Sequence, residues 1–474
     1  MKSIIGRVKE IEQLDNVLKS NKSEFIAVYG RRRVGKTFLI REYFDYTFDF
    51  QLTGLANATT EQQLINLHAS LRRESTLSID NIPKNWFEAF QYLIDHLETI
   101  EDNRKKIIFL DELPWLDTAK SDFMISLEHF WNSWATNRKD IVLITCGSAA
   151  SWMINNLVNN HGGLHNRVTE RMKIEPFTLK ETELMLKSRN NVLDRYQIIQ
   201  LYMVLGGIPY YLDAVKADKS AAQNIENLCF RKGALLATEF KNLFASLFKN
   251  AEKHEAIIRA IATVNQGISR QNIAKAVGVK TGGSLTKRLM ELEESGFITR
   301  YTPFNKKSRD TLYRLSDFYS FFYLKFIDKN TDFDEGIWVN AIDNPKQRTW
   351  AGYTFEQVCL AHIPQIKKAL GINGILTKTA SWKSKESVNN AQIDLVIDRR
   401  DQVINLCEIK FSINPYTITK SYSENLRNKI GVFRTETKTR KAVFLTFITT
   451  YGLMKNKHSV GLVQNEITMD SLFE

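Results

Sequence analysis

The chain has 474 residues, of which 43% are hydrophobic and 25% charged, and its formal net charge is +12. This length predicts two to four domains with sizeable cores, and no run approaches the ~18 consecutive apolar residues of a membrane-spanning helix, so we expect no membrane partner. The four cysteines (Cys146, Cys229, Cys359 and Cys407) are scattered, which argues against disulfides and a metal–thiolate site. The early charge in Met1–Arg7 argues against a signal peptide. These features together predict a cytoplasmic setting.

A glycine-rich loop follows the first apolar run. The run Phe25–Tyr29 predicts a buried strand, and a helix-like stretch begins after the loop. This order of strand, loop and helix is the Walker A arrangement, in which backbone N–H groups surround phosphate oxygens. An ordinary glycine turn is the structural alternative. The expected nucleotide-binding residues are Gly30, Arg31, Arg32, Arg33, Val34, Gly35, Lys36, Thr37 and Phe38.

Lys36 and Thr37 have defined roles in such a loop. Lys36 would reach the β- and γ-phosphates of ATP as a catalytic residue, and the Thr37 hydroxyl would bind Mg²⁺. A second apolar run, Ile107–Leu110, ends in Asp111 and Glu112 and predicts the Walker B strand. Asp111 would hold Mg²⁺ through water, and Glu112 would polarise the attacking water. Many strands end in an acidic turn, so this pattern alone is weak evidence. A strand that ends in Asp-Glu downstream of a Walker A loop indicates ATP hydrolysis.

Two further residues are candidates for the nucleotide site. The run Ile141–Ser148 predicts a buried strand that ends in small polar residues beside the Walker B carboxylates, so Ser148 would sense the γ-phosphate as a catalytic residue. A plain strand-end serine is the alternative. Arg167 would reach nucleotide in the same or a neighbouring subunit, and an ordinary surface arginine is the alternative.

The middle of the chain predicts helices and then a winged helix. Residues of about 180 to 250 have a helical pattern that Gly206–Pro209 interrupts, either as a plain loop or as a hinge that follows the nucleotide. Residues of about 251 to 316 predict three helices, with Lys287 and Arg288 on the third, then two strands around the basic loop 305–309. Such a fold places its third helix in the major groove. The acidic residues on that helix instead favour a winged helix used only for domain contacts.

The basic excess lies in the second half of the chain. Residues 266–315 hold ten Lys and Arg against four Asp and Glu, and residues 351–474 hold seventeen against eleven. Each range therefore has a net charge of +6, and the rest of the chain has a net charge of zero. This asymmetry favours nucleic acid as a partner, because cationic side chains that neutralise phosphates release counterions. A generic basic surface is the alternative. The intervening aromatic residues of 317–350 predict a packing helix rather than a platform for base stacking.

The last domain holds a second candidate site. Residues 392–398 and 403–411 predict a hairpin, in which Glu408 and Lys410 share one face and Asp394 enters from the neighbouring strand. Glu356 lies upstream in a helix-like stretch. Acidic oxygens and a lysine around one spot can bind a divalent ion and a scissile phosphate, with Lys410 as a catalytic residue. Cross-strand ion pairs often produce the same pattern.

The order of these features resembles a known family. The segments Ile5–Glu10, Tyr29–Thr37, Leu110–Glu112, Cys146–Ser148 and Gly206–Pro209 resemble the archaeal-type ATPases, which are AAA+/STAND-related P-loop NTPases. The resemblance implies an α/β fold, namely a doubly wound parallel sheet with a helical lid, then a winged helix and a small domain similar to PD-(D/E)XK nucleases. The expected parts are an ATPase core (1–180), a lid (181–250), a winged helix (251–316), an aromatic linker helix (317–350) and a nuclease-like domain (351–474).

The resemblance also implies ligands and partners. ATP and Mg²⁺ are the expected cofactors, with Thr37, Asp111, Asp394 and Glu408 as the metal ligands that the resemblance implies. Glu356 joins these ligands because of its place in the upstream helix-like stretch. Ile393 stands where the nuclease signature has proline. DNA is the expected partner of the winged helix and the last domain, while the oligomeric state and any protein partner stay open.

Two functions remain after this reasoning. The first is an ATP-powered enzyme that binds DNA and cleaves it with Mg²⁺. The second is an NTP-dependent regulatory, defence or mobile-element switch whose last domain binds DNA or protein without cleavage.

Overall fold

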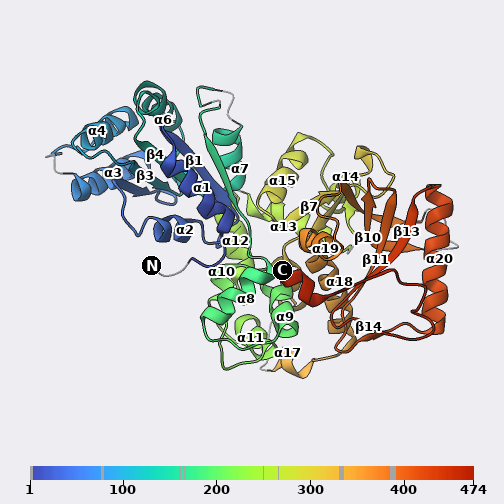
Figure 1. The fold of residues 1–474 in the computed structure, drawn as a ribbon. Helices are drawn as coiled ribbons and strands as arrows, with labels where there is room; N and C mark the ends of the chain where they lie inside the picture. The colour runs from blue at the N-terminus through green and yellow to red at the C-terminus, as the bar shows by residue number, and fades with distance from the viewer. Residues whose placement is uncertain are drawn as a thin grey trace. The chain divides into compact units, whose positions relative to one another are not determined.

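The computed structural model describes residues 4–75, 79–159, 162–164, 166–248, 250–264, 266–329, 336–384 and 391–474. The chain forms two compact units, Met1–Pro176 and Phe177–Glu474 (Figure 1). Sequence reasoning expected five parts. Within the described ranges, no helix is both long and apolar enough to cross a membrane. All four cysteines are buried and free.

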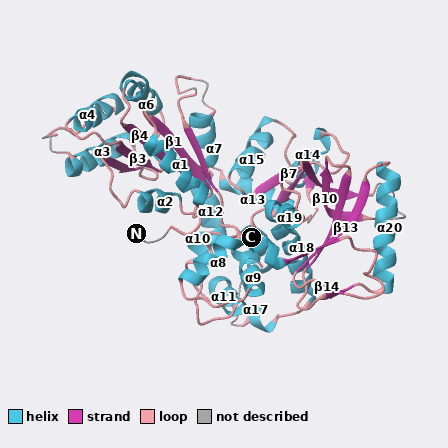
Figure 2. Ribbon diagram, in the orientation of Figure 1, coloured by secondary structure: helices cyan, strands magenta, loops and turns pink. Residues whose placement is uncertain are grey.

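The first unit is built on a parallel five-stranded sheet in the order β2-β3-β4-β1-β5 (Figure 2). The strands are buried apolar runs, as expected for a parallel sheet covered on both faces. Their bounds are β1 Glu24–Gly30, β2 Phe50–Thr53, β3 Lys106–Asp111, β4 Ile141–Gly147 and β5 Glu170–Ile174. The helices are α1 Val8–Lys19, α2 Lys36–Tyr43, α3 Thr60–Glu74, α4 Trp86–Glu98, α5 Leu113–Leu116, α6 Phe123–His129 and α7 Ala150–Met153, with π-helical turns at Phe130–Trp134 and Ile154–Val158 and a 3-10 turn at Ala135–Asn137.

One hydrophobic cluster of the first unit lies on one face of this sheet. Phe25 of β1 and Leu143 of β4 pack there with buried side chains of α3, α4 and α6, among them Trp86 and Leu127. On the opposite face Phe109 of β3 stacks on Phe48, which follows α2 (ring centroids 5.2 Å apart). Because β3, β4 and β1 are parallel neighbours, the loops after these strands meet at one edge of the sheet.

The second unit begins with helices and continues into a small antiparallel sheet in the order β6-β8-β7. Gly207 lets its backbone pack closely against Phe177, the first residue of this unit, because a Cβ at Gly207 would lie 2.1 Å from the Phe177 carbonyl oxygen. The first elements are α8 Leu179–Ser188, α9 Arg195–Leu205, α10 Pro209–Leu212, α11 Ala221–Cys229 and α12 Glu239–Leu247. Next come α13 Ala251–Ala262, β6 Ile268–Ser269, α14 Arg270–Ala276, α15 Gly283–Glu294, β7 Ile298–Tyr301, a 3-10 turn at Ser308–Asp310 and β8 Leu312–Leu315.

The aromatic segment packs inside the second unit. Its helices are α16 Phe318–Phe322, a π-helical turn at Tyr323–Ile327 and α17 Ile337–Asn340. Tyr319 lies against Tyr211 of α10, and Tyr323 stacks on Phe240 of α12. The rings of this segment thus pack on neighbouring helices, and its role as a linker helix stays a prediction. These contacts help to explain why the predicted lid, winged helix and last domain belong to one compact unit, although their predicted boundaries stay predictions.

A mixed sheet in the order β15-β13-β11-β10-β9 forms the last part of the chain. Strands β9, β10 and β11 are antiparallel, whereas β13 pairs in parallel with β11 and β15. The helices are α18 Pro345–Ala361, α19 Ile363–Ala369 and α20 Lys420–Thr437, with a 3-10 turn at Met469–Phe473. The strands are β9 Thr377–Lys383, β10 Gln392–Arg399, β11 Val403–Lys410, β13 Ala442–Thr449, β15 Asn465–Thr468 and a separate parallel pair, β12 Tyr416–Thr417 and β14 Leu453–Met454.

Candidate functional site

The loop between β1 and α2 has the backbone that a phosphate cradle requires. Gly30 has φ +144°, and a Cβ at this position would lie 2.3 Å from the Ile174 carbonyl oxygen. Gly35 has φ +87° and open space where a Cβ would stand. Gly30 is needed because β5 approaches the loop closely, while Gly35 provides the left-handed conformation before α2 begins at Lys36.

Lys36 is buried at the start of α2. Its ammonium donates hydrogen bonds to the carbonyl oxygens of Gly30 (3.1 Å) and Arg31 (2.9 Å). Burial lowers the pKa of Lys36, against the opposing influence of Cys146, Glu112 and Asp111. A buried cation that faces mainly neutral carbonyl oxygens would gain stabilisation from a phosphate group, so the cradle fits an anionic ligand.

The other loop residues divide by exposure. Val34 and Arg31 are buried, Arg32 and Arg33 are half-buried, and the Phe38 side chain is 53% exposed. Arg33 adopts φ +70°. Sequence reasoning gave no chemical role to Arg7, whose side chain donates to the carbonyl oxygens of Val34 (2.9 Å) and Glu175 (2.7 Å). Arg7 therefore ties the loop to the segment after β5, and only its place in the family resemblance marked it.

Thr37 and Asp111 meet across two elements. The Thr37 hydroxyl donates to Asp111 Oδ1 at 3.0 Å, which joins α2 to the end of β3. Burial and the neighbouring Glu112 raise the pKa of Asp111. Arg41 of α2, which the sequence did not indicate, places its guanidinium 4.0 Å from Asp111 Oδ2. A hydroxyl and two clustered carboxylates form an oxygen donor set of the kind that Mg²⁺ prefers.

Glu112 stands in a strained conformation and is held by Ser148. Its φ of 48° is left-handed, which is uncommon for a residue with a side chain and is found at functional sites. The Ser148 hydroxyl donates to Glu112 Oε1 (2.7 Å), and the Ser148 N–H donates to Oε2 (3.2 Å). Because β4 pairs with both β3 and β1, Ser148 lies next to the carboxylates as expected. Its contact in this structure is with Glu112.

Arg167 lies in the segment before β5 and is exposed. In the part of the chain that the structure describes, its side chain forms no hydrogen bond or ion pair. The role in nucleotide binding therefore stays a prediction.

The second site lies where β10 and β11 pair. Leu395 faces Cys407 in this antiparallel ladder, so Asp394 and Glu408 are the next residues on the two strands. Like charges at such positions repel each other, and burial together with Glu408 raises the pKa of Asp394. On α18, burial and Asp394 raise the pKa of Glu356 to about 8. The three predicted carboxylates are thus close enough to influence one another.

Cations surround Glu408 in particular. Lys410 Nζ lies 2.8 Å from Oε1, and Lys429 Nζ of α20 lies 2.9 Å from Oε2. Tyr422 of α20 also donates its hydroxyl to Glu408. Burial would raise the pKa of Glu408, but the two lysines hold it below its usual value. Sequence reasoning missed Tyr422 and Lys429; their spacing of seven residues, two helical turns, was the available signal.

These contacts leave the second site without a ready metal triad. Among the described residues, no group of three or more His, Cys, Asp or Glu side chains is arranged to hold a metal ion. The expectation that Glu356, Asp394 and Glu408 converge on one ion therefore differs from the structure, because the Glu408 oxygens are bonded to Lys410, Lys429 and Tyr422. Asp394 and Glu356 still carry carboxylate oxygens, which are hard ligands of the kind that divalent cations prefer.

Comparison with known proteins decides the class of the first site. Residues 4–215 match the family described as "ATPase domain predominantly from Archaea". Residues 4–215 are therefore similar to archaeal-type ATPase domains. A Walker-type ATPase of Pyrococcus abyssi has a similar fold, with a TM-score of 0.50 and 18% identity over 68% of this chain and 96% of that protein. The ATPase domain therefore has a P-loop NTPase fold, as its Walker motifs predicted.

Two proteins of Methanocaldococcus jannaschii are similar in sequence. An uncharacterized protein is 27% identical over 417 residues, which cover 86% of this chain and 87% of that protein. An uncharacterized ATP-binding protein is 44% identical over 41 residues, 9% of this chain and 70% of that protein. The first match extends well beyond the ATPase domain, so the chain shares most of its length with that relative.

Proposed function

We propose that the archaeal-type ATPase domain binds and hydrolyses Mg²⁺·ATP and that this reaction controls DNA binding and cleavage by the second unit. The observation that carries the first part is the hydrogen bond between Thr37 and Asp111, beside the buried ammonium of Lys36. When bound, Mg²⁺ would neutralise charge on the phosphates. Thr37 and Asp111 would hold that ion, and Lys36 would bind the β- and γ-phosphates.

Glu112 would orient the attacking water in this reaction. Ser148 fixes both oxygens of its carboxylate, so the base is positioned before substrate binds. Positioning of this kind is the main protein contribution to phosphoryl transfer, because the transition state needs little covalent help. Replacing Glu112 with Gln should abolish steady-state turnover while ATP still binds, and unchanged turnover would contradict this role.

The helices and sheet of 251–315 support the winged-helix prediction and a DNA partner. Lys306, Lys307 and Arg309 are exposed in the loop between β7 and β8, and Lys287 is exposed on α15. The acidic residues of α15 argue against DNA binding, because their charge repels phosphates. Glu291, however, binds His254 (2.7 Å) and Glu293 binds Arg300 (3.2 Å). The Arg300 pair offsets the charge of Glu293 and so reduces its repulsion of a phosphate backbone, which favours DNA binding over a purely structural role.

Cleavage is the second part of the proposal and rests on the Glu356, Asp394, Glu408 and Lys410 cluster. Asp394 and Glu356 would accept a divalent ion, which would relieve the repulsion between their buried carboxylates. Glu408 would join them when it exchanges its lysine contacts for the metal. Lys410 would then be free to stabilise the charge that develops on the scissile phosphate.

The alternative is a nucleotide-dependent switch whose last domain binds without cutting. The observation that favours it is the saturation of Glu408 by Lys410, Lys429 and Tyr422, an arrangement that a structural ion-pair network also produces. A cleavage assay with Mg²⁺ or Mn²⁺ separates the two functions. Wild-type protein should cleave DNA, and Asp394→Ala and Lys410→Ala should each lose the activity. Equal products from all three proteins, or none from the wild type, would leave the switch.

A further inference from the structure

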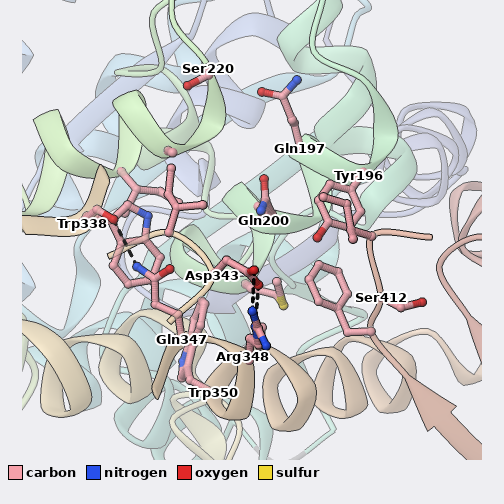
Figure 3. Close-up of a pocket in the computed structure, with 17 residues that line it drawn as sticks. Tyr196, Gln197, Gln200, Ser220, Trp338, Asp343, Gln347, Arg348, Trp350 and Ser412 are labelled. Atoms are coloured by element: carbon pink, nitrogen blue, oxygen red, sulfur yellow. Dashed lines mark hydrogen bonds and ion pairs between the residues drawn. The ribbon is translucent and has the colours of Figure 1, made fainter. Parts of the chain in front are cut away.

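The second unit contains a cavity of about 640 Å³ (Figure 3). Glu356, Asp394, Glu408 and Lys410 are not among the described residues that line it. Its walls come from α9, α11, α17 and α18 and from the residues that follow β11. A cavity of this size lies in the range that binds small molecules. None of the roles assigned above uses it.

Aromatic side chains form two walls of this cavity. Tyr196 of α9 stacks on Phe411, with ring centroids 5.0 Å apart and planes 9° apart. On another side Trp338 and Trp350 pack edge to face at 5.7 Å, and they are only 7% and 4% exposed. The packing holds these rings in place, so a flat ligand would meet preorganised apolar surfaces.

The polar groups of the lining suit a neutral ligand that both donates and accepts hydrogen bonds. Gln200 lies in the middle of the lining side chains, and its amide forms no hydrogen bond within the described residues (Figure 3). Asp343 and Arg348 are the charged residues among the described side chains that line the cavity, and they bind each other. No net charge therefore awaits the ligand, while one amide offers a donor and an acceptor side by side.

We propose that this cavity binds a nucleobase, stacked on the aromatic walls and paired through its edge to Gln200. Bases are flat, neutral and carry adjacent donors and acceptors, and a glutamine amide pairs with such an edge. The base can come from a free nucleoside or from an unstacked position in a single strand. Two connections between the cavity and the carboxylate cluster support the single strand as the source. Phe411 of the lining directly follows Lys410, and α18 carries both Ala351 of the lining and Glu356, about 7.5 Å apart along the helix.

Calorimetric titration of the full chain tests the proposal with three probes. These are thymidine, a single-stranded dT oligomer, and an abasic oligomer of the same length. Ala222→Trp fills the cavity from α11 without removing any core side chain, and Gln200→Leu removes the amide at nearly constant size. Ala217→Trp, at an exposed position outside the lining, is the matched control.

The proposal expects thymidine or the dT oligomer to bind and the abasic oligomer to bind at least about tenfold more weakly than the dT oligomer. Ala222→Trp and Gln200→Leu should each weaken the base-dependent binding about tenfold or more, while Ala217→Trp should leave it unchanged. Binding of thymidine identifies a free nucleoside as sufficient, and binding of the oligomer alone identifies a strand. No binding of either, or binding that Ala222→Trp does not change in a folded protein, would overturn the proposal.

Discussion

The contact between Ser148 and Glu112 predicts how the ATPase responds to loss of one hydroxyl. Ser148→Ala removes the 2.7 Å hydrogen bond to Glu112 Oε1 and keeps the backbone hydrogen bond to Oε2. A hydrogen bond to a charged group contributes about 1.5–3 kcal/mol. If that energy orients Glu112 in the transition state, kcat should fall by about tenfold to a hundredfold, because 1.4 kcal/mol corresponds to about tenfold. KM for ATP should change less than about twofold, since the lost contact is within the protein.

The control for this experiment lies three residues further along the chain. Ser151 is half-buried, and its hydroxyl has no hydrogen-bond partner among the described residues. Ser151→Ala should therefore keep wild-type kcat, and Glu112→Gln gives the floor of the assay. The measurement is steady-state phosphate release at saturating ATP, together with ATP and ADP affinities.

Two results would refute this reasoning. A Ser148→Ala protein with wild-type kcat would show that the hydroxyl does not position Glu112 for catalysis. A protein with normal kcat that no longer prefers ATP over ADP would instead assign Ser148 to sensing the γ-phosphate, which was the sequence-based expectation.

Three further outcomes follow from individual contacts. Gly30→Ala should lower the free energy of unfolding by about 2 kcal/mol or more in a urea titration, because its Cβ would lie 2.3 Å from the Ile174 carbonyl oxygen; an unchanged midpoint would contradict the close approach. Burial raises the pKa of Glu74 to about 7, so the folded state retains the Glu74 proton and the free energy of unfolding falls as pH rises from about 4.5 to 7. Glu74→Gln should remove about 1 kcal/mol of that fall after solvent screening, measured by urea titrations at several pH values. The same fall in the variant as in the wild type would refute this expectation. Lys306→Ala and Arg309→Ala should each lower the slope of log affinity against log salt for duplex DNA by about 1, whereas wild-type slopes would exclude the loop from the interface.

Local sequence predicted the strand, loop and helix that carry the candidate nucleotide site, because these parts are contiguous or lie at strand ends. The strand before Gly30, the loop and the helix from Lys36 follow one another in the chain, and buried apolar runs identified the strands that end at Asp111 and Gly147. The expectation that Ser148 lies beside the carboxylates is correct, since β4 pairs with β3.

Long-range contacts account for what the sequence did not reveal. Tyr422 and Lys429 reach Glu408 from α20, which begins ten residues after β11 ends, and nothing in the local pattern of β11 specifies that meeting. The pairing of Glu291 with His254 likewise joins two helices and changes how the charge on α15 is interpreted. The single compact second unit depends on such contacts too, because rings such as Tyr319 pack across predicted domain boundaries.

Binding of Mg²⁺·ATP is the measurement that tests the central claim most directly. Titration calorimetry should show saturable binding to wild-type protein and an affinity at least about tenfold lower for Lys36→Ala, because the buried ammonium would bind the phosphates. Thermal melting establishes that the variant is folded. Wild-type protein that binds no ATP, or a folded Lys36→Ala protein that binds it equally well, would contradict the claim.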